Sequence, residues 1–321
     1  MIISHFFGAV IWALNSTLIK KGVITAAGLG TRLLSVTKAQ PKEMLPVFAR
    51  CKEGGVCMKP IVQLVFEDLY NMGIRDFCFV VGRGQRIIRE HFTPDFSYLS
   101  ILDKRGRNGL AKELEAFYEM VGRSGIAWVN QPEPRGFGDA VMIAEGFVGG
   151  ESFLLHAGDN FFVSKNRDHL KRLLDAANSL QASAVFLVQK VENPRSYGVV
   201  EANSEDNGLV HVKRVIEKPE SPASNLAIMP AYVLKPEIFA ALSETRPGYG
   251  GELQLTDGIQ RIIESGRDVY GIDVNSDAVR LDVGSPELFM DAQAQSYKRA
   301  VEEKSSINQD QSRNSRIPKT V

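Results

Sequence analysis

Residues 22–32 read GVITAAGLGTR. The run from Gly22 to Ala27 is short and apolar, and it stops at the glycines Gly28 and Gly30. A short apolar run bounded by glycine is typical of a buried parallel strand that enters a tight turn. Ligands of open α/β sheets bind at the carboxyl ends of the strands, where glycines let backbone N–H groups approach phosphates. This stretch therefore predicts a first strand and a phosphate-binding loop.

The glycine loop differs from two common nucleotide-binding motifs. No Gly-Lys-Ser/Thr follows it, as a Walker loop requires, and Leu33 stands where a dinucleotide fingerprint has its third glycine. Three cations follow the loop: Arg32, Lys38 and Lys42. Pro41 keeps Lys42 out of a helix interior, so the three charges can face one polyphosphate. A tight turn followed by solvated lysines is the alternative interpretation.

Helix and strand patterns alternate along the rest of the chain. Helices are expected at 60–72, 110–121, 139–147 and 168–180, and strands at 77–81, 126–130, 152–156 and 184–188. This β-α-β order predicts a Rossmann-like, doubly wound, mostly parallel sheet in an α/β protein. Strands at 197–201 and 210–217 predict a smaller β-rich subregion. Later elements are expected at 227–234, 252–264 and 279–281, and in a closing helix that begins at Ser285-Pro286-Glu287.

The two ends differ from the main domain, which we place at 20–303. Residues 1–19 form an apolar N-terminal extension, but the basic pair Lys20-Lys21 follows the apolar stretch, whereas a secretory signal has its basic region first. The stretch is also marginal in length for a membrane span. Residues 304–321 are polar and aperiodic, which predicts a disordered tail.

The charge balance argues against two classes of partner. The 38 basic residues equal the 38 acidic ones, so no net field favours nucleic acid or an anionic membrane. Three cysteines, Cys51, Cys57 and Cys78, are too few for a secreted disulfide framework. We therefore expect a cytoplasmic protein in a reducing setting, where a Cys51–Cys57 disulfide is possible but disfavoured.

Further motifs make a family resemblance specific. Residues 26–48 read AAGLGTRLLSVTKAQPKEMLPVF, and the later matches are QPEPRGFGDAV (131–141), HAGDN (156–160), YGVVE (197–201), VIEKPESPASNLAI (215–228), GELQLTDGI (251–259) and RLDVGSPE (280–287). In order and spacing they resemble the sugar-1-phosphate nucleotidylyltransferases. The segment KAQPKEMLP is most similar to UTP–glucose-1-phosphate uridylyltransferases. The resemblance implies UDP-glucose and pyrophosphate as products of UTP and glucose 1-phosphate, and a homo-oligomer, dimer or tetramer, that uses the helix at 287–301.

The resemblance also implies a role for each matching residue. The nucleotide would be bound by Ala27, Gly28, Gly30, Thr31, Gln131 and Gly136, of which Gln131 and Gly136 would hold the base. The phosphates would be held by the catalytic residues Arg32, Lys42 and Lys218. The sugar phosphate would be contacted by Gly198, Glu217, Lys218 and Asn225. Magnesium would be held by Asp159 and Asp282.

General chemistry agrees with these roles. An anionic sugar phosphate needs no general base to attack the α-phosphorus, so the protein must align two anions and neutralise their repulsion. Mg²⁺ usually takes one or two carboxylates plus phosphate oxygens and waters, which suits Asp159 and Asp282 at two predicted strand ends. Each aspartate has a simpler interpretation as a turn residue. The simpler interpretation of Glu217 and Lys218 is an exposed ion pair, and that of Gln131 is an ordinary loop residue.

Two segments depart from the uridylyltransferase pattern. Residues 47–58 form an insertion where many relatives have a tight turn, and we expect a mobile lid or an oligomer contact there. The QPEPRG loop resembles the thymidylyltransferase pattern, so glucose-1-phosphate thymidylyltransferase is the first alternative and a sugar-nucleotide-dependent glycosyltransferase the second. A nicotinamide-dependent oxidoreductase is disfavoured, because Val81-Gly82-Arg83-Gly84 places no acid at the end of the second strand.

Overall fold

The structure is a computed structural model that describes residues 19–52, 54–82, 85–164, 167–274 and 278–314. The predicted N-terminal extension therefore lies outside the described residues except for Ile19, which is buried. No described helix is both long and apolar enough to cross a membrane.

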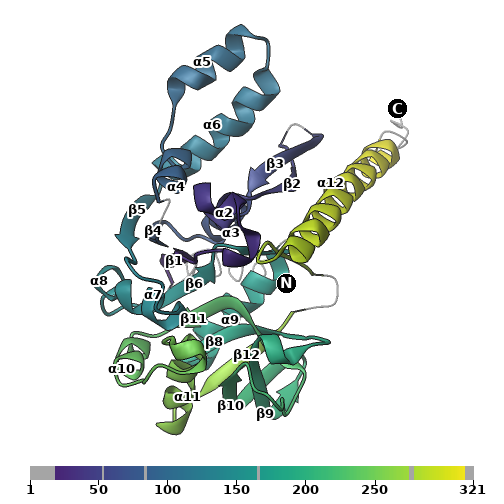
Figure 1. Cartoon of the computed structure of the whole chain (residues 1–321). Helices are drawn as coiled ribbons and strands as arrows, with labels where there is room; N and C mark the ends of the chain where they lie inside the picture. Colours follow the sequence, from purple (N-terminus) through teal and green to yellow (C-terminus); the bar gives the residue numbers. More distant parts are fainter. Residues whose placement is uncertain (1–18, 53, 83–84, 165–166, 275–277, 315–321) are drawn as a thin grey trace, which may run out of the picture.

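A mixed sheet forms the centre of the molecule (Figure 1). Within the described residues it has nine strands, in the order β5 (Gly125–Asn130), β4 (Asp76–Val81), β1 (Lys21–Ala26), β6 (Phe153–Ala157), β11 (Leu226–Leu234), β8 (Ala184–Lys190), β12 (Val269–Asp273), β10 (Leu209–Glu217) and β9 (Gly198–Asp206). The strands β5, β4, β1 and β6 are mutually parallel, as the β-α-β pattern predicted.

The sheet is mixed, so the prediction of a mostly parallel, doubly wound sheet was confirmed only in part. In the second half of the sheet β12 pairs parallel with β8, and the other pairings between described strands are antiparallel. Strand β11 runs antiparallel to both β6 and β8, and β10 runs antiparallel to β12 and β9. A local connection explains the pair β9 and β10, because only Asn207 and Gly208 join them and they form an antiparallel hairpin. Strand β11 runs in the same direction as β10, and its antiparallel pairing with β6, β8 and β9 is long-range. Because β11 pairs with β6 as well as β9, the β-rich subregion continues the main sheet.

Helices cover both faces of this sheet, because alternate residues of its strands point to opposite sides. One face carries Ile24 and Phe79 and packs against α3 (Ile61–Asn71), α4 (Gln85–His91), α6 (Asn108–Gly122) and α9 (Asp168–Leu180). The other carries Val23 and Cys78 and packs against α7 (Phe137–Ile143), α8 (Glu145–Val148), α10 (Glu237–Ser243) and α11 (Leu255–Glu264).

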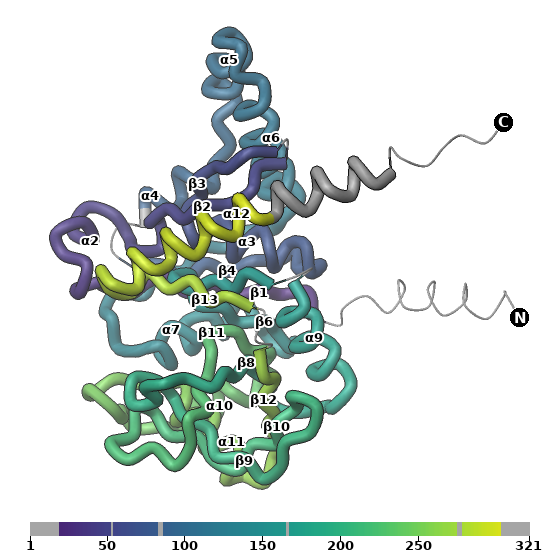
Figure 2. Tube along the Cα trace, turned by 90° about the vertical axis from the view of Figure 1, so that its right-hand side faces the viewer, coloured from purple at the N-terminus to yellow at the C-terminus, as the bar shows by residue number. Residues whose placement is uncertain are grey.

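A two-stranded hairpin and the last described helix of the chain form a second layer at one edge of the molecule. The insertion predicted at 47–58 is a hairpin of β2 (Pro46–Arg50) and β3 (Val56–Pro60), and α12 (Pro286–Asn314) lies across it (Figure 2). The buried Ala292 of α12 packs in one cluster with Val47 and with Leu281 of β13 (Val279–Asp282), which pairs with β7 (Asn160–Val163).

Helix α12 continues into part of the predicted disordered tail, to Asn314. No glycine or proline interrupts residues 287–314, so nothing local stops the helix there. The remaining tail, 315–321, lies outside the described residues. The helices α5 (Phe96–Lys104) and α6 form an arm that projects from the body (Figure 1).

Candidate active site

Two adjoining cavities open beside the glycine loop. The smaller, about 360 Å³, is lined by the predicted loop residues Ala27, Gly28, Gly30 and Thr31 and by Lys42, Gln131 and Gly136. The larger, about 710 Å³, is lined by Arg32, Gly198, Glu217, Lys218 and Asp282. Both cavities include Phe137, Ala157, Asp159 and Glu252 in their walls. The residues predicted for nucleotide and for sugar phosphate therefore lie in neighbouring compartments, except that Arg32, predicted for the triphosphate, lies in the larger one.

The glycine loop follows β1 and ends in the short helix η1 (Thr31–Leu33). Gly30 has a φ of 62°, and its carbonyl oxygen accepts a hydrogen bond of 2.8 Å from Thr37 Oγ1. A Cβ at this position would lie 2.9 Å from Thr37 Cγ2, so glycine is required both by conformation and by space. Lys38, in α2 (Val36–Ala39), is exposed and lines neither cavity.

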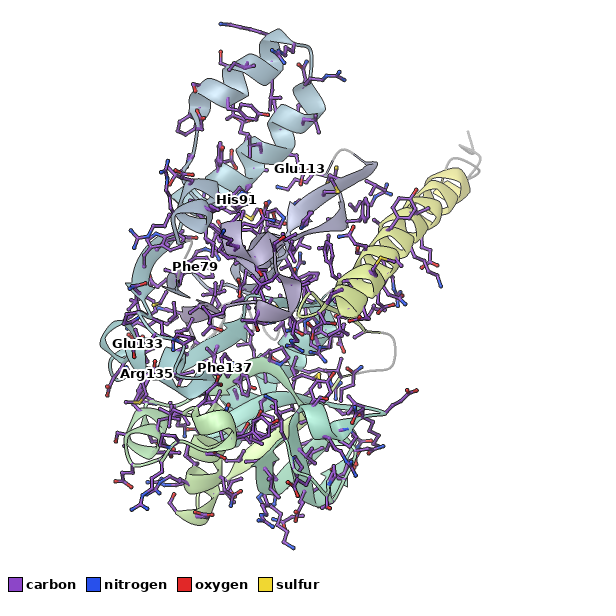
Figure 3. The ribbon with its side chains drawn as sticks, viewed as in Figure 1. Phe79, His91, Glu113, Glu133, Arg135 and Phe137 are labelled. Atoms are coloured by element: carbon purple, nitrogen blue, oxygen red, sulfur yellow. The ribbon has the colours of Figure 1, made fainter. Side chains whose placement is uncertain are left out.

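Gln131 is buried at the end of β5, in the wall of the smaller cavity. Its side-chain amide nitrogen donates to Asp139 Oδ2 at 2.7 Å and to the carbonyl oxygen of Gly136 at 3.2 Å. Gly136 has a φ of 118°, and a Cβ there would lie 2.4 Å from the Leu253 carbonyl oxygen. Figure 3 shows Glu133, Arg135 and Phe137 along the segment that leads from this loop into α7.

Asp159 and Asp282 come together because β7 and β13 pair antiparallel, with Asp282 opposite Asn160. Each carboxylate already has a cation: Lys42 Nζ lies 2.5 Å from Asp159 Oδ2, and Arg280 Nη2 lies 2.5 Å from Asp282 Oδ2. The short helix η2 (Lys42–Met44) positions Lys42, and Pro41 precedes it as predicted.

Burial and neighbouring opposite charges shift the pKa values of these groups in opposite directions. Burial alone would raise the pKa of Asp159, but the Lys42 ammonium lowers it to about 2. Burial alone would lower the pKa of Lys42, but Asp159 and Glu43 raise it above its ordinary value. Burial raises the pKa of Asp282; Arg280 opposes this shift and the neighbouring Asp159 adds to it. The pair Lys42 and Asp159 is therefore charged at neutral pH.

The sugar-side residues lie in the larger cavity. Glu217 Oε2 accepts a 2.7 Å hydrogen bond from Thr256 Oγ1, and Glu217 Oε1 lies 3.5 Å from Lys218 Nζ. The ammonium of Lys218 also lies 4.9 Å from the ring centroid of Tyr249, in the short helix η5 (Tyr249–Gly251). Asn225, which was predicted to contact the sugar phosphate, is exposed and lines neither cavity.

The described residues contain no group of three or more His, Cys, Asp and Glu side chains suited to hold a metal by themselves. Two carboxylates beside a phosphate-binding loop do fit Mg²⁺, which takes one or two protein carboxylates and completes its shell with phosphate oxygens and waters. The donor set of Asp159 and Asp282 is compatible with that ion when an anionic substrate is also present.

Residues 21–299 match a protein-family model described as nucleotidyl transferase. The chain belongs to this nucleotidyl transferase family. It is 37% identical over 270 residues to a UTP–glucose-1-phosphate uridylyltransferase of Staphylococcus saprophyticus, and the match covers 83% of this chain and 88% of that protein. It is 35% identical over 269 residues, with the same coverage, to the enzyme so named in Staphylococcus epidermidis.

Solved structures of related proteins share the fold. A UDP-glucose pyrophosphorylase complexed with UDP-glucose superimposes with a TM-score of 0.75 at 29% identity, covering 88% of this chain and 99% of that one. A UTP-bound enzyme from Acinetobacter baumannii gives 0.75 at 28% identity, covering 90% and 98%.

Two features of this nucleotidyl transferase were missed by sequence reasoning. Arg280 donates to Asn160 Oδ1 at 2.8 Å and to the Tyr197 hydroxyl at 3.0 Å, in addition to Asp282. Its position two residues before Asp282 on one strand was the available signal, since such residues share a face. Glu43 is also buried beside Lys42, and burial raises its pKa to about 7.

Proposed function

We propose that this chain is a UTP–glucose-1-phosphate uridylyltransferase that forms UDP-glucose and pyrophosphate from UTP and glucose 1-phosphate. The observation that carries the proposal is the pair of cavities that meet at Asp159, with the glycine loop on one side and Lys218 on the other. The named relatives and the solved structures with UDP-glucose or UTP support the same activity.

In this proposal UTP occupies the smaller cavity and glucose 1-phosphate the larger. A phosphate oxygen of the sugar attacks the α-phosphorus of UTP in line, the new O–P bond forms, and the bond to the β-phosphate oxygen breaks to release pyrophosphate. The attacking oxygen is already anionic, so no general base is needed. Lys42, in the smaller cavity, would reduce the charge of the triphosphate. Arg32 and Lys218, in the larger cavity, would reduce the charge where the sugar phosphate meets it, so that two anions can approach each other.

We also propose that Asp159 and Asp282 hold Mg²⁺. Bound there, the ion would neutralise phosphate charge and orient the reacting oxygens. Lys42 and Arg280 pair with these carboxylates in the described structure. On substrate binding both cations would turn toward phosphate oxygens, which offer them equivalent acceptors.

The nucleotide base bound in the smaller cavity would be a pyrimidine with an N–H at its Watson–Crick edge. The amide nitrogen of Gln131 is occupied by Asp139 and Gly136, so its Oε1 remains to accept from N3–H of uracil. Thymine has the same edge and differs by one methyl group, which is worth only about 1–3 kcal/mol in a pocket. Glucose-1-phosphate thymidylyltransferase therefore stays the second candidate, favoured by the QPEPRG loop.

A pyrophosphate-release panel tests the proposal. UTP, dTTP, CTP, ATP and GTP are each combined with glucose 1-phosphate and with other sugar 1-phosphates in the presence of Mg²⁺. We expect the highest kcat/KM for UTP with glucose 1-phosphate. A higher value for dTTP would reassign the enzyme to the thymidylyltransferases. Glucose transfer from UDP-glucose to an acceptor without pyrophosphate chemistry would instead support a glycosyltransferase.

A further inference from the structure

A third cavity, about 300 Å³, lies away from the two cavities of the candidate active site and shares no lining residue with them. Its walls come from the hairpin β2–β3, α3, β7, α12, and the residues Ser164 and Arg167. The apolar part includes Phe48, Phe161 and Ala300. The proposed nucleotidyl transfer uses none of these side chains.

The charged part of this wall is mainly cationic. It contains Arg50, Lys59, Arg167 and Arg299, against the carboxylates of Glu67 and Asp68, and a third carboxylate, Glu113, pairs with Lys59 from outside the wall. Positive charge thus gathers from four separate elements around one small cavity, although the protein as a whole has no net charge. Such a local surplus favours an anionic ligand.

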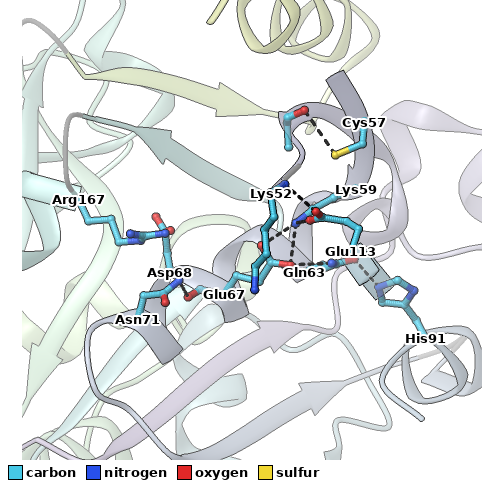
Figure 4. Close-up of polar contacts among 11 residues, drawn as sticks. Lys52, Cys57, Lys59, Gln63, Glu67, Asp68, Asn71, His91, Glu113 and Arg167 are labelled. Carbon is cyan, nitrogen blue, oxygen red and sulfur yellow. Dashed lines mark hydrogen bonds and ion pairs between the residues drawn. The ribbon is translucent and has the colours of Figure 1, made fainter. Parts of the chain in front are cut away.

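Two of the cations are held in place by acids (Figure 4). Lys59 Nζ lies 3.0 Å from Glu67 Oε2 and 2.7 Å from Glu113 Oε1. Arg167 Nε lies 2.5 Å from Asp68 Oδ1. These pairs fix the side chains of the wall, so that the order of the site does not depend on the ligand.

Arg50 is different. Its Nη1 is buried and has no hydrogen-bond partner among the described residues. A buried guanidinium nitrogen without an acceptor is costly, and an anion in the cavity would supply the acceptor. The planar fork of an arginine matches the oxygens of a phosphate in particular.

We propose that this cavity is a binding site for a compact phosphate-bearing anion, an effector rather than a substrate, with Arg50 as its principal contact. Strand β7 links the two sites. Phe161, Phe162 and Val163 line this cavity, whereas Asn160, the first residue of β7, and Asp159, which precedes it, lie in the wall of the candidate active site. An anion that fixes β7 against α12 and the hairpin would therefore act on the carboxylate pair through a single strand.

Calorimetric titration of the full chain with inorganic phosphate, at constant ionic strength with chloride as the balancing anion, tests this site. Arg50→Met keeps an unbranched side chain as far as the position of Nε but removes the charged end, and it should weaken the phosphate affinity by about tenfold or more, as expected for a lost charge-assisted contact. Arg50→Lys should retain part of the affinity. Arg86→Met is the matched control, because Arg86 is exposed on α4, pairs with Glu90 and is not among the described residues that line this cavity. The phosphate affinity of this variant should change less than twofold.

Lys42→Met separates this site from the proposed triphosphate site. If the proposal holds, this variant keeps an Arg50-dependent phosphate site even if nucleotidyl transfer is lost. Melting curves show whether each variant is folded. If Arg50→Met does not fold, the phosphate affinity of Arg50→Lys is compared with that of the wild type instead. Equal phosphate affinity in the wild type, Arg50→Met and Arg50→Lys, or complete loss of phosphate binding in Lys42→Met alone, would overturn the proposal.

Discussion

The amide nitrogen of Gln131 donates to Asp139 at 2.7 Å and to the Gly136 carbonyl oxygen at 3.2 Å, so Oε1 is the side-chain atom left to bond a ligand in the smaller cavity. We predict that Asp139→Leu lets the amide turn over and present a donor instead. Cytosine, whose N3 is an acceptor, would then be tolerated, and the ratio of kcat/KM for UTP over CTP should fall by about tenfold or more. Arg135→Gln serves as the control, because it removes the exposed partner of Asp139 but leaves the bond to Gln131. An unchanged ratio in Asp139→Leu would show that this carboxylate does not set the base preference.

The two carboxylates at the junction of the cavities carry a second prediction. Asp159→Asn and Asp282→Asn should each lower turnover by roughly 100-fold or more, comparable to losing a transition-state electrostatic contact. Steady-state kinetics at increasing Mg²⁺ measure this effect. Near-normal turnover of either variant at saturating Mg²⁺ would remove that residue from the proposed metal site.

Glu43 gives a prediction on pH. Burial raises its pKa from 4.5 to about 7, so between these values the folded chain binds a proton that the unfolded chain has released. The free energy of unfolding should therefore fall as pH rises through this window, by up to roughly 3 kcal/mol. Glu43→Gln should flatten this part of the curve. Denaturant unfolding from pH 4.5 to 7.5, with a chelator present to exclude metal ions, measures it; parallel curves for wild type and variant would contradict the assignment.

At the scale of elements, α12 is part of the core as well as of the surface. Ala292 is 1% exposed and packs against the layer formed by the hairpin and β13, whereas Ala294 on the same helix is exposed. Ala292→Glu should lower the free energy of unfolding by at least about 3 kcal/mol, because it buries a charge without a partner. The same change at Ala294 should stay within about 0.5 kcal/mol. Similar losses in both variants would mean that α12 does not depend on this packing.

At the scale of the whole molecule, we predict a homo-oligomer that uses α12. Met290, Tyr297 and Val301 are 73%, 52% and 38% exposed and recur at helical spacing, so they form one apolar stripe. Light scattering should give the mass of a dimer or tetramer, and Met290→Glu combined with Val301→Glu should lower it. Phe96→Glu, on the projecting arm, adds a charge to another exposed apolar position and should leave the mass unchanged. A monomeric wild-type chain would contradict the prediction.

The sequence by itself determined the parallel half of the sheet, the glycine loop and the placement of Lys42, because these depend on short-range patterns: an apolar strand, a glycine with positive φ, and a proline ahead of a lysine. It also placed Asp159 and Asp282 at strand ends. It did not predict the hairpin at 46–60, because each strand there is short and lacks clear alternation.

Only the tertiary structure decided which strands pair and which charges meet. The insertion of β11 between β6 and β8, the approach of Asp282 to Asp159, and the contact of Arg280 with Asn160 join residues far apart in the chain. Register and pairing of this kind follow from burying one face of each strand against the rest of the molecule. Local pattern therefore specified the strand ends at which the proposed site lies, and long-range packing specified the distances between them.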